Sequence, residues 1–379
     1  MSAAAASTDP DRSMPVAARA ALVVALLYAF LVGISLLESG IGELGSGVQE
    51  SLFSSVTNPI AGLCVGILAT VLVQSSSVTT STVVGLVGTG LLGVGDAVPV
   101  IMGANIGTTV TSTLAALGHV RRPQEFRGAF AAATVHDMFN LLAVIVLLPL
   151  ELATGILESS AKWLSERLVG ADGATFESPI KAVVERPSEA LIDVIDGLAS
   201  GTALGILLIV AAMVTIFMAL GFITRNMRII VATRIERSVS MLLEKGGGMA
   251  ALALGLVITV AVQSSSITTS VLVPLAAAGV ISVRNVYPVA LGANIGTTVT
   301  ALLAAMAASR PEALTIALVH TLFNLAGTLL FYPVPFMREI PIRMAERVAL
   351  VGSERRALVG VYVVTSFIII PAFGLLLLR

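Results

Sequence analysis

Long apolar runs with almost no charged residues alternate with short charged loops along the whole chain. The runs cover residues 17–37, 59–95, 97–117, 129–150, 201–222, 249–283, 286–308, 313–331 and 357–378. Most of them reach the roughly 20 residues that an α-helix needs to cross the hydrocarbon of a bilayer. The pattern therefore predicts an all-α polytopic membrane protein.

The chain contains an internal repeat. When residues 74–112 are aligned with residues 263–301 at a constant offset of 189, 22 of 39 positions are identical. Each copy holds a Gln-Ser-Ser-Ser motif, a Gly-Ala-Asn-Ile-Gly-Thr-Thr motif and a His-x-x-Phe-Asn motif, at 74–77, 103–109 and 136–140 and again at 263–266, 292–298 and 320–324. Identity at this level over two different motifs indicates duplication.

Each copy reads as a spanning helix, a long apolar run broken by the serines, a glycine-interrupted helix and another spanning helix. If the broken run is a re-entrant helical hairpin, each copy crosses the membrane three times. An odd number of crossings inverts the second copy relative to the first, so we expect two inverted-topology repeats.

Loop charge offers an independent test of this topology. Loops 118–127, 224–245 and 333–356 are rich in arginine, whereas residues 151–200 hold nine acidic and four basic residues. Basic loops stay in the cytoplasm, which places the N-terminus inside as well. The side of the C-terminus stays open.

This topology divides the chain into six parts. They are an N-terminal tail (1–16), a first transport repeat (17–150), an extracellular connector (151–200), a second inverted repeat (201–332), a cytoplasmic loop (333–356) and a C-terminal transmembrane helix (357–379). Residues 225–245 alternate arginine with apolar residues, which fits either an amphipathic helix in the inner interface or a solvated connector.

The amino-acid composition supports a membrane protein and narrows the function only by what it lacks. Hydrophobic residues make up 56% and charged residues 12%, about half the charge of a soluble domain. Cys64 is the one cysteine of the sequence, so an intramolecular disulfide cannot form. No cluster with metal spacing, nucleotide-binding glycine loop or activated serine is present, so we expect no enzyme, no cofactor, no ATP-driven transport and no nucleic-acid partner.

The Gln-Ser-Ser-Ser turns predict an anion site. A single membrane serine usually serves close helix packing, but four consecutive polar residues inside an uncharged run need partners. Inversion would bring both turns to the midplane, where free N–H groups and helix N-termini favour a small oxygen-rich anion. The candidate substrate residues are Gln74, Ser75, Ser76, Ser77, Gln263, Ser264, Ser265 and Ser266.

The glycine motifs predict cation sites. Glycines that interrupt a helix would expose carbonyl oxygens, and neighbouring Asn and Thr side chains add neutral oxygens that suit Na⁺. Alternatively, the glycines only permit close helix packing. Asp137 is the one acidic residue well inside a predicted span and is a functional candidate by default, whereas Thr321 stands at its position in the second copy. His136 and His320 are more typical of helix packing.

These doubled motifs, together with residues 121–140, resemble the type II sodium-dependent phosphate cotransporter family. The resemblance implies sodium-coupled symport of inorganic phosphate into the cell by alternating access, with Na⁺ as coupling ion. Ala131, Ala133 and Asp137 match a pattern of the electrogenic branch. The candidate sodium residues, from the motifs and the resemblance together, are Thr79, Thr80, Asn105, Thr108, Asp137, Thr268, Thr269, Asn294 and Thr297.

The chain differs from animal members of that family in its short connector, which lacks a cysteine pair, and in its short tails. We expect a multi-pass protein of the plasma membrane in contact with lipid, and a homodimer is left open. Another oxyanion as cargo, a passive anion channel and a structural membrane protein are the alternatives. A purely structural role would not explain why two polar turns are predicted to lie buried at the same depth.

Overall fold

The computed structural model describes residues 14–44, 58–169, 179–197, 199–245 and 247–378, and within those ranges it contains helices and no strands. The predicted N-terminal tail therefore lies almost wholly outside the described residues. The helices are α1 (Val16–Gly42), α3 (Pro59–Val73), α4 (Ser76–Thr89), α5 (Val94–Thr108), α6 (Val110–Leu117), α7 (Pro123–Thr154), α8 (Ile156–Val169), α9 (Pro179–Asp196), α10 (Thr202–Lys245), α11 (Gly248–Val262), α12 (Ser265–Ala277), α13 (Val283–Ala305), α14 (Pro311–Phe331), α15 (Pro335–Glu354), α16 (Arg356–Val364), the π-helical η2 (Thr365–Ile369) and α17 (Ile370–Leu377).

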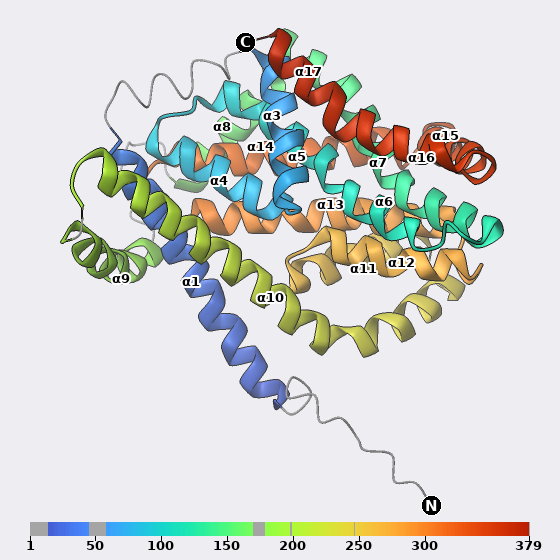
Figure 1. The fold of residues 1–379 in the computed structure, drawn as a ribbon, viewed down its shortest axis with the longest axis horizontal. Coiled ribbons are helices and arrows are strands. Elements are labelled where there is room, and N and C mark those ends of the chain that lie inside the picture. The colour runs from blue at the N-terminus through green and yellow to red at the C-terminus, as the bar shows by residue number, and fades with distance from the viewer. Residues whose placement is uncertain (1–13, 45–57, 170–178, 198, 246, 379) are drawn as a thin grey trace, which may run out of the picture.

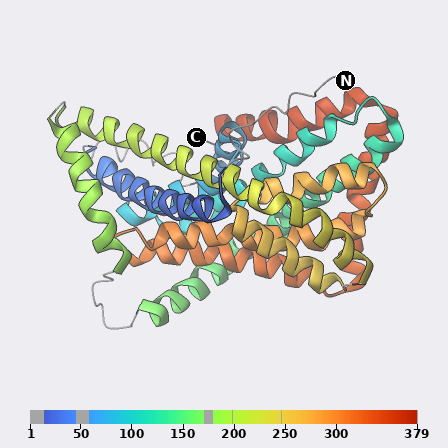
Figure 2. The same cartoon turned by 90° about the horizontal axis from the view of Figure 1, so that it is seen from below.

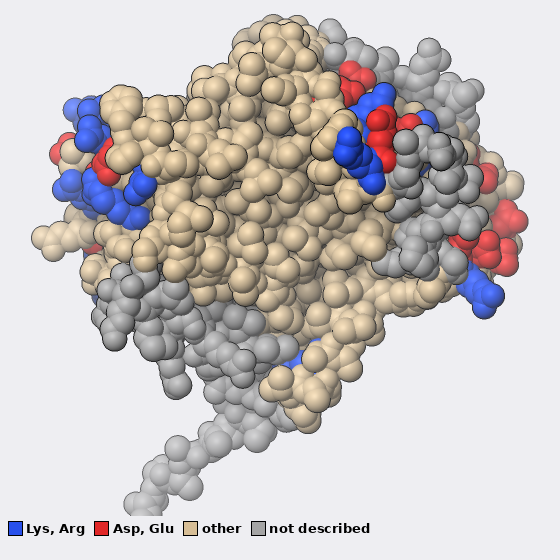
Figure 3. All heavy atoms as spheres, turned by 180° about the vertical axis from the view of Figure 1, so that it is seen from behind, with Lys and Arg blue, Asp and Glu red and all other residues tan. Residues whose placement is uncertain are grey.

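Seven helical segments among the described residues are long and apolar enough to cross a membrane: α1, α5–α6, α7, the first part of α10, α13, α14 and α16–α17. Figure 3 shows a wide surface without charged side chains, with Lys, Arg, Asp and Glu gathered at its two edges. A surface of that kind is stable against lipid and costly against water. The prediction of an all-α polytopic membrane protein is confirmed.

Two helical hairpins carry the serine motifs. In each hairpin the first helix, α3 or α11, has 15 residues, and the second, α4 or α12, has 14 or 13. At about 1.5 Å per residue, such an arm is about 22 Å long and falls short of the roughly 30 Å hydrocarbon core. Neither hairpin therefore has an arm long enough to span the bilayer upright.

The glycine motifs do not interrupt their helices as expected. Gly103 and Gly107 lie inside α5, and α13 continues without a break through Gly292 and Gly296. The only interruption is at Thr109, whose amide bonds to the carbonyl of Ile106 where α5 gives way to α6. Glycine inside a helix costs only about 1 kcal/mol, so packing decides whether the helix continues.

Close helix crossing is what the glycines provide. A Cβ atom at Gly103 would overlap the carbonyl oxygen of Leu63 on α3, and one at Gly292 would overlap that of Leu252 on α11. Gly66 and Gly255 meet carbonyl oxygens of α5 and α13 in the same way. These glycines therefore permit close helix packing, and the role of the neighbouring Asn and Thr side chains as sodium ligands stays a prediction.

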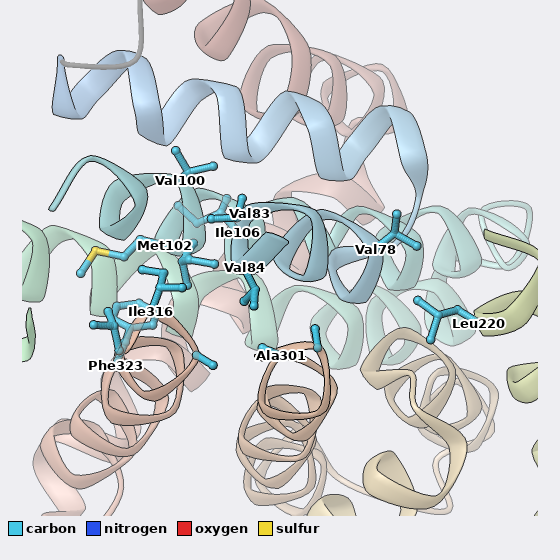
Figure 4. Packing of buried hydrophobic residues seen from close by; sticks show 14 of the residues in the cluster. Val78, Val83, Val84, Val100, Met102, Ile106, Leu220, Ala301, Ile316 and Phe323 are labelled. Atoms are coloured by element: carbon cyan, nitrogen blue, oxygen red, sulfur yellow. The ribbon is translucent and has the colours of Figure 1, made fainter. Parts of the chain in front are cut away.

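Each copy packs its hairpin against the other copy. Helix α4 contacts α13 and α14, whereas α12 contacts α6 and α7. Figure 4 shows this core, in which Val84 of α4 lies between Ile316 of α14 and Ala301 of α13 in this view, while Val78 lies farther along α4, toward Leu220. Helices α1 and α10 run side by side against this core (Figures 1 and 2). The polar turns consequently lie at the contact between the two copies.

The segments between and after the copies are also helical. The predicted connector contains α8 and α9, and the predicted cytoplasmic loop is α15, which packs along α7. Residues 225–245 form the end of α10 as a continuous helix. Its placement in the inner interface stays a prediction.

Candidate functional site

The two Gln-Ser-Ser-Ser turns have the same backbone. Gln74 ends α3 and Gln263 ends α11, both in the left-handed region with φ of 57° and 55°. Ser75 and Ser264 then cap α4 and α12, each accepting a hydrogen bond from the amide three residues on. A left-handed residue followed by a serine cap stops one helix and starts the next in a new direction.

The glutamine side chains lock each turn to the helix behind it. In both turns Nε2 donates to the carbonyl three residues earlier, at 2.5 Å for Gln74 and 2.7 Å for Gln263. Their Oε1 atoms accept from Thr111 at 3.2 Å and from Thr300 at 2.8 Å. These glutamines are thus turn-stabilising groups in this conformation.

The turns touch each other across the two copies. Ser77 Oγ donates to the carbonyl oxygen of Gln263 at 3.3 Å, and Ser266 Oγ donates to that of Thr108 at 3.4 Å. Ser76 and Ser265 begin α4 and α12 and are buried. The first amides of a helix have no intrahelical acceptor, so two sets of N–H donors face this one region.

A cleft of about 460 Å³ reaches the second turn. Its lining runs from the turn along α12 and includes α6, through Thr111, Ser266, Ile267, Ser270, Val271, Pro274 and Leu275. The corresponding serines of the first copy are closed off, with Ser77 5% and Ser81 0% exposed. Only the second turn therefore borders this cleft.

Behind the turns, four asparagines and a histidine join the copies. His136 Nε2 lies 2.5 Å from Asn294 Oδ1, and Asn294 Nδ2 donates to Asn140 Oδ1 at 2.6 Å. Asn140 Nδ2 donates to the carbonyl of Asn105 at 2.8 Å, which the break at α6 has freed. Asn324 Nδ2 lies 3.5 Å from Asn105 Oδ1. Asn105 and Asn294 are thus partly used in holding the helices together.

The candidate sodium threonines divide into two groups. Thr79, Thr80, Thr108 and Thr297 donate to carbonyls of their own helix or its cap. The hydroxyls of Thr268 and Thr269 also meet other helices, at 2.8 Å from Thr259 and 2.6 Å from Ser112. A hydroxyl that donates its proton keeps lone pairs for a cation.

Asp137 is 4% exposed and has two hydrogen-bond donors. Thr109 Oγ1 donates to Oδ1 at 3.1 Å, and the Tyr362 hydroxyl on α16 donates to Oδ2. At the equivalent position, Thr321 bonds only to the carbonyl of Ala317 in its own helix. At this position, a carboxylate with two donors is found in the first copy and a threonine in the second.

The structure brings the two serine turns into contact. The predicted sodium residues Asn105 and Asn294 both bond to Asn140, and Asp137 bonds to Tyr362 on α16. Sequence reasoning missed several neighbours: Ser112, Asn140, Ser270, Asn324 and Tyr362. Asn140 and Asn324 were marked by the third repeated motif. Nothing in the sequence pattern pointed to Tyr362.

Comparison with known proteins finds relatives over most of the chain. A family model described as Na+/Pi-cotransporter matches residues 29–159 and 215–335, which contain both copies of every motif and leave α16 outside. A sodium-dependent phosphate transport protein 2A from Ovis aries is 34% identical over 429 residues, covering 93% of this chain and 67% of the relative. A sodium-dependent phosphate transport protein 2B from Homo sapiens is 34% identical over 453 residues, covering 94% and 65%. No solved structure matches the chain.

Proposed function

Because the chain belongs to the Na+/Pi-cotransporter family, we propose that it carries inorganic phosphate into the cell together with Na⁺, as a secondary active transporter. It acts as a transporter and catalyses no reaction. In this proposal it spans the plasma membrane with the N-terminus in the cytoplasm, and its two repeats are inverted around a midplane site.

One observation carries the substrate assignment. The two serine turns lie in contact, through Ser77 and the carbonyl of Gln263, and each turn opens a helix with free amides. Amides and hydroxyls converging from two helix N-termini suit a tetrahedral oxyanion, since every phosphate oxygen can accept. Phosphate is therefore bound between the turns, by Gln74 to Ser77 and Gln263 to Ser266.

Sodium is held next to this site by neutral oxygens and one carboxylate. The oxygens come from the asparagines and threonines of the glycine motifs and from Thr268 and Thr269, with Asp137 supplying a negative charge. A buried carboxylate is costly until a cation or strong donors neutralise it. A sodium ion at Asp137 adds one positive charge to the cycle, which makes transport electrogenic.

The proposal of alternating access is supported by a difference between the turns, since Ser266 borders a cleft whereas its counterpart Ser77 is buried. The cleft at Ser266 runs along α12, and Ala277 at the end of α12 clusters with Ala349 of α15, the helix of the predicted cytoplasmic loop. We assign this conformation to the inward-open state. Exchange of the two copies' environments, closing the α12 cleft and opening its counterpart along α4, yields the outward-open state.

Radiolabelled phosphate uptake into proteoliposomes tests the proposal. Uptake is expected only with an inward Na⁺ gradient and is lost when K⁺ replaces Na⁺. Phosphate flux that runs equally without sodium would identify a passive anion channel instead.

Competition identifies the cargo. Amide and hydroxyl donors could bind any small oxyanion, so the site alone does not distinguish them. Arsenate, sulfate and a phosphonate at tenfold excess over labelled phosphate show which anion the protein prefers. Inhibition by sulfate alone would reassign the substrate while leaving the coupling proposal in place.

Cysteine labelling tests the access assignment. In a Cys64→Ala background, Ser266→Cys reacts with an impermeant thiol reagent from the inner face, whereas Ser77→Cys, at the equivalent position, stays unlabelled. External sodium and phosphate are expected to make Ser77→Cys reactive from the outer face. Labelling of both from one face would contradict inverted repeats.

A further inference from the structure

Tyr362 is the contact between the C-terminal helix and the candidate cation site. It lies on α16, outside both ranges matched by the family model, and 225 residues separate it from Asp137. Its hydroxyl donates to Asp137 Oδ2 while Thr109 donates to Oδ1. In this conformation both carboxylate oxygens therefore have a protein donor.

The tyrosine ring is fixed from two sides. Its centroid lies 6.2 Å from that of Phe130 at an interplanar angle of 79°, and 6.3 Å from that of Phe367 at 85°. Phe367 is fully buried and belongs to the π-helical segment η2, which begins three residues after Tyr362. Single π-helical turns are frequent at functional sites, where they re-aim side chains.

The same side chain borders a second cleft. This cleft of about 260 Å³ lies between α7, α15 and α16 and is lined by Phe130, Arg347, Val351, Leu358 and Tyr362, among others. Tyr362 thus contacts the carboxylate with its hydroxyl and an open space with its ring. The cleft beside Tyr362 offers space for the hydroxyl to move once its ring contacts shift.

We propose that Tyr362 is a positioning residue that holds Asp137 in the sodium-free state and is displaced when sodium binds. An ionised carboxylate only accepts, so a hydrogen-bond donor and a cation compete for the same oxygen. Sodium entry breaks the O–H···O bond, and sodium release restores it. The bond therefore lowers the sodium affinity of the site, which favours release inside the cell. The inference rests on the proposed role of Asp137.

Tyr362→Phe tests it, because the change removes the hydroxyl and keeps the ring contacts. Half-saturating sodium for phosphate uptake is expected to fall about threefold to tenfold, the change that one modest hydrogen bond produces. Tyr287→Phe is the matched control, since its buried hydroxyl has no partner among the described residues. It should leave sodium dependence unchanged.

A double-mutant cycle separates competition from a structural role. In an Asp137→Gly background, Tyr362→Phe is expected to have no further effect on sodium dependence. The shift of the thermal unfolding midpoint with sodium concentration gives a second readout that needs no transport, because sodium that binds the folded state raises it.

Each other outcome has a defined meaning. An unchanged sodium affinity in Tyr362→Phe, or an equal shift in both backgrounds, overturns the inference. A weakened affinity that depends on Asp137 overturns it too, by making Tyr362 a sodium ligand. If Asp137→Gly alone leaves sodium and voltage dependence unchanged, the proposed role of Asp137 has failed, and the inference falls with it.

Discussion

The α3–α4 and α11–α12 hairpins share a backbone and differ in their surroundings. Both turn at a left-handed glutamine and restart at a serine cap. Yet Ser77 is buried, whereas its counterpart Ser266 borders a cleft of about 460 Å³. Local sequence fixes the turn, and the helices around it decide whether it is open. In the proposed transport cycle, this difference is one of conformational state.

A second difference is permanent. Asp137 stands where the other copy has Thr321, and it alone receives a bond from α16. No exchange of conformations can make these positions equivalent. The two copies thus share the motifs of the proposed substrate site and differ in charge at this position.

The largest effect should follow from filling either turn. Ser75→Leu and Ser264→Leu are each expected to lower phosphate uptake by roughly tenfold or more, since a bulky apolar side chain replaces a cap beside the proposed site. Uptake per folded protein, with folding checked by size-exclusion chromatography, is the measurement.

The matched alanine variants isolate the cap. Ser75→Ala and Ser264→Ala remove the hydroxyl and its capping bond, worth about 1 kcal/mol of stability, without filling the turn. If one leucine variant transports normally, the two turns do not share one substrate.

Removing the negative charge of Asp137 should have the next largest effect on transport. Asp137→Gly is expected to keep sodium-dependent phosphate uptake and lose its sensitivity to membrane potential, because one cation leaves the cycle. Uptake at potentials set with potassium and valinomycin measures this.

Thr321→Ala is the matched control, as its hydroxyl bonds only within its own helix. It should leave voltage dependence intact. Persistent voltage sensitivity in well-folded Asp137→Gly would mean that Asp137 serves helix packing.

The glycine crossings should respond alike in both copies. Gly103→Ala and Gly292→Ala each force a Cβ into a backbone carbonyl, so a loss of about 1 to 3 kcal/mol of stability is expected. Thermal unfolding in detergent reports it. Gly221→Ala on α10, where no atom lies within 4 Å of the added Cβ, should change little. Similar stability of all three variants would refute close packing as the role of these glycines.

The smallest effect concerns an ion pair found only in the second copy. Arg284 on α13 bonds to Glu339 on α15 at 2.8 Å, and Gly95 stands at its position in the first copy. Arg284 lowers the pKa of Glu339 below its ordinary value of 4.5, so the pair stabilises the fold above that pH and ceases to do so as pH falls through the lowered value.

Glu339→Gln should therefore lower the free energy of unfolding near pH 7 by no more than about 1 kcal/mol, as expected for an exposed pair. The measurement is a slightly lower unfolding temperature. The difference from the unmutated chain should disappear in strong acid. An equal loss at both pH values would assign the effect to packing of α15.

Sequence reasoning succeeded where a feature is local or repeated. The turns at Gln74 and Gln263 follow from short motifs, and the helical membrane class follows from the long apolar runs. It failed at the glycines, which were expected to break helices. Whether a helix continues through glycine depends on the helix that crosses it, here α3 or α11.

Contacts between distant parts of the chain were beyond its reach. The bond from Tyr362 to Asp137 joins residues 225 positions apart, and no spacing rule connects them. That Ser266 borders a cleft while Ser77 is buried could not be predicted either, since both turns have the same Gln-Ser-Ser-Ser sequence.

The packing of each hairpin against the other copy bears on how the chain is made. Helix α4 packs against α1, α3 and α5 of its own copy and also against α13 and α14, which leave the ribosome about two hundred residues later. The first hairpin can therefore form part of its packing during synthesis of the first copy. The bond from Ser77 to the carbonyl of Gln263 has to wait until the second copy is made.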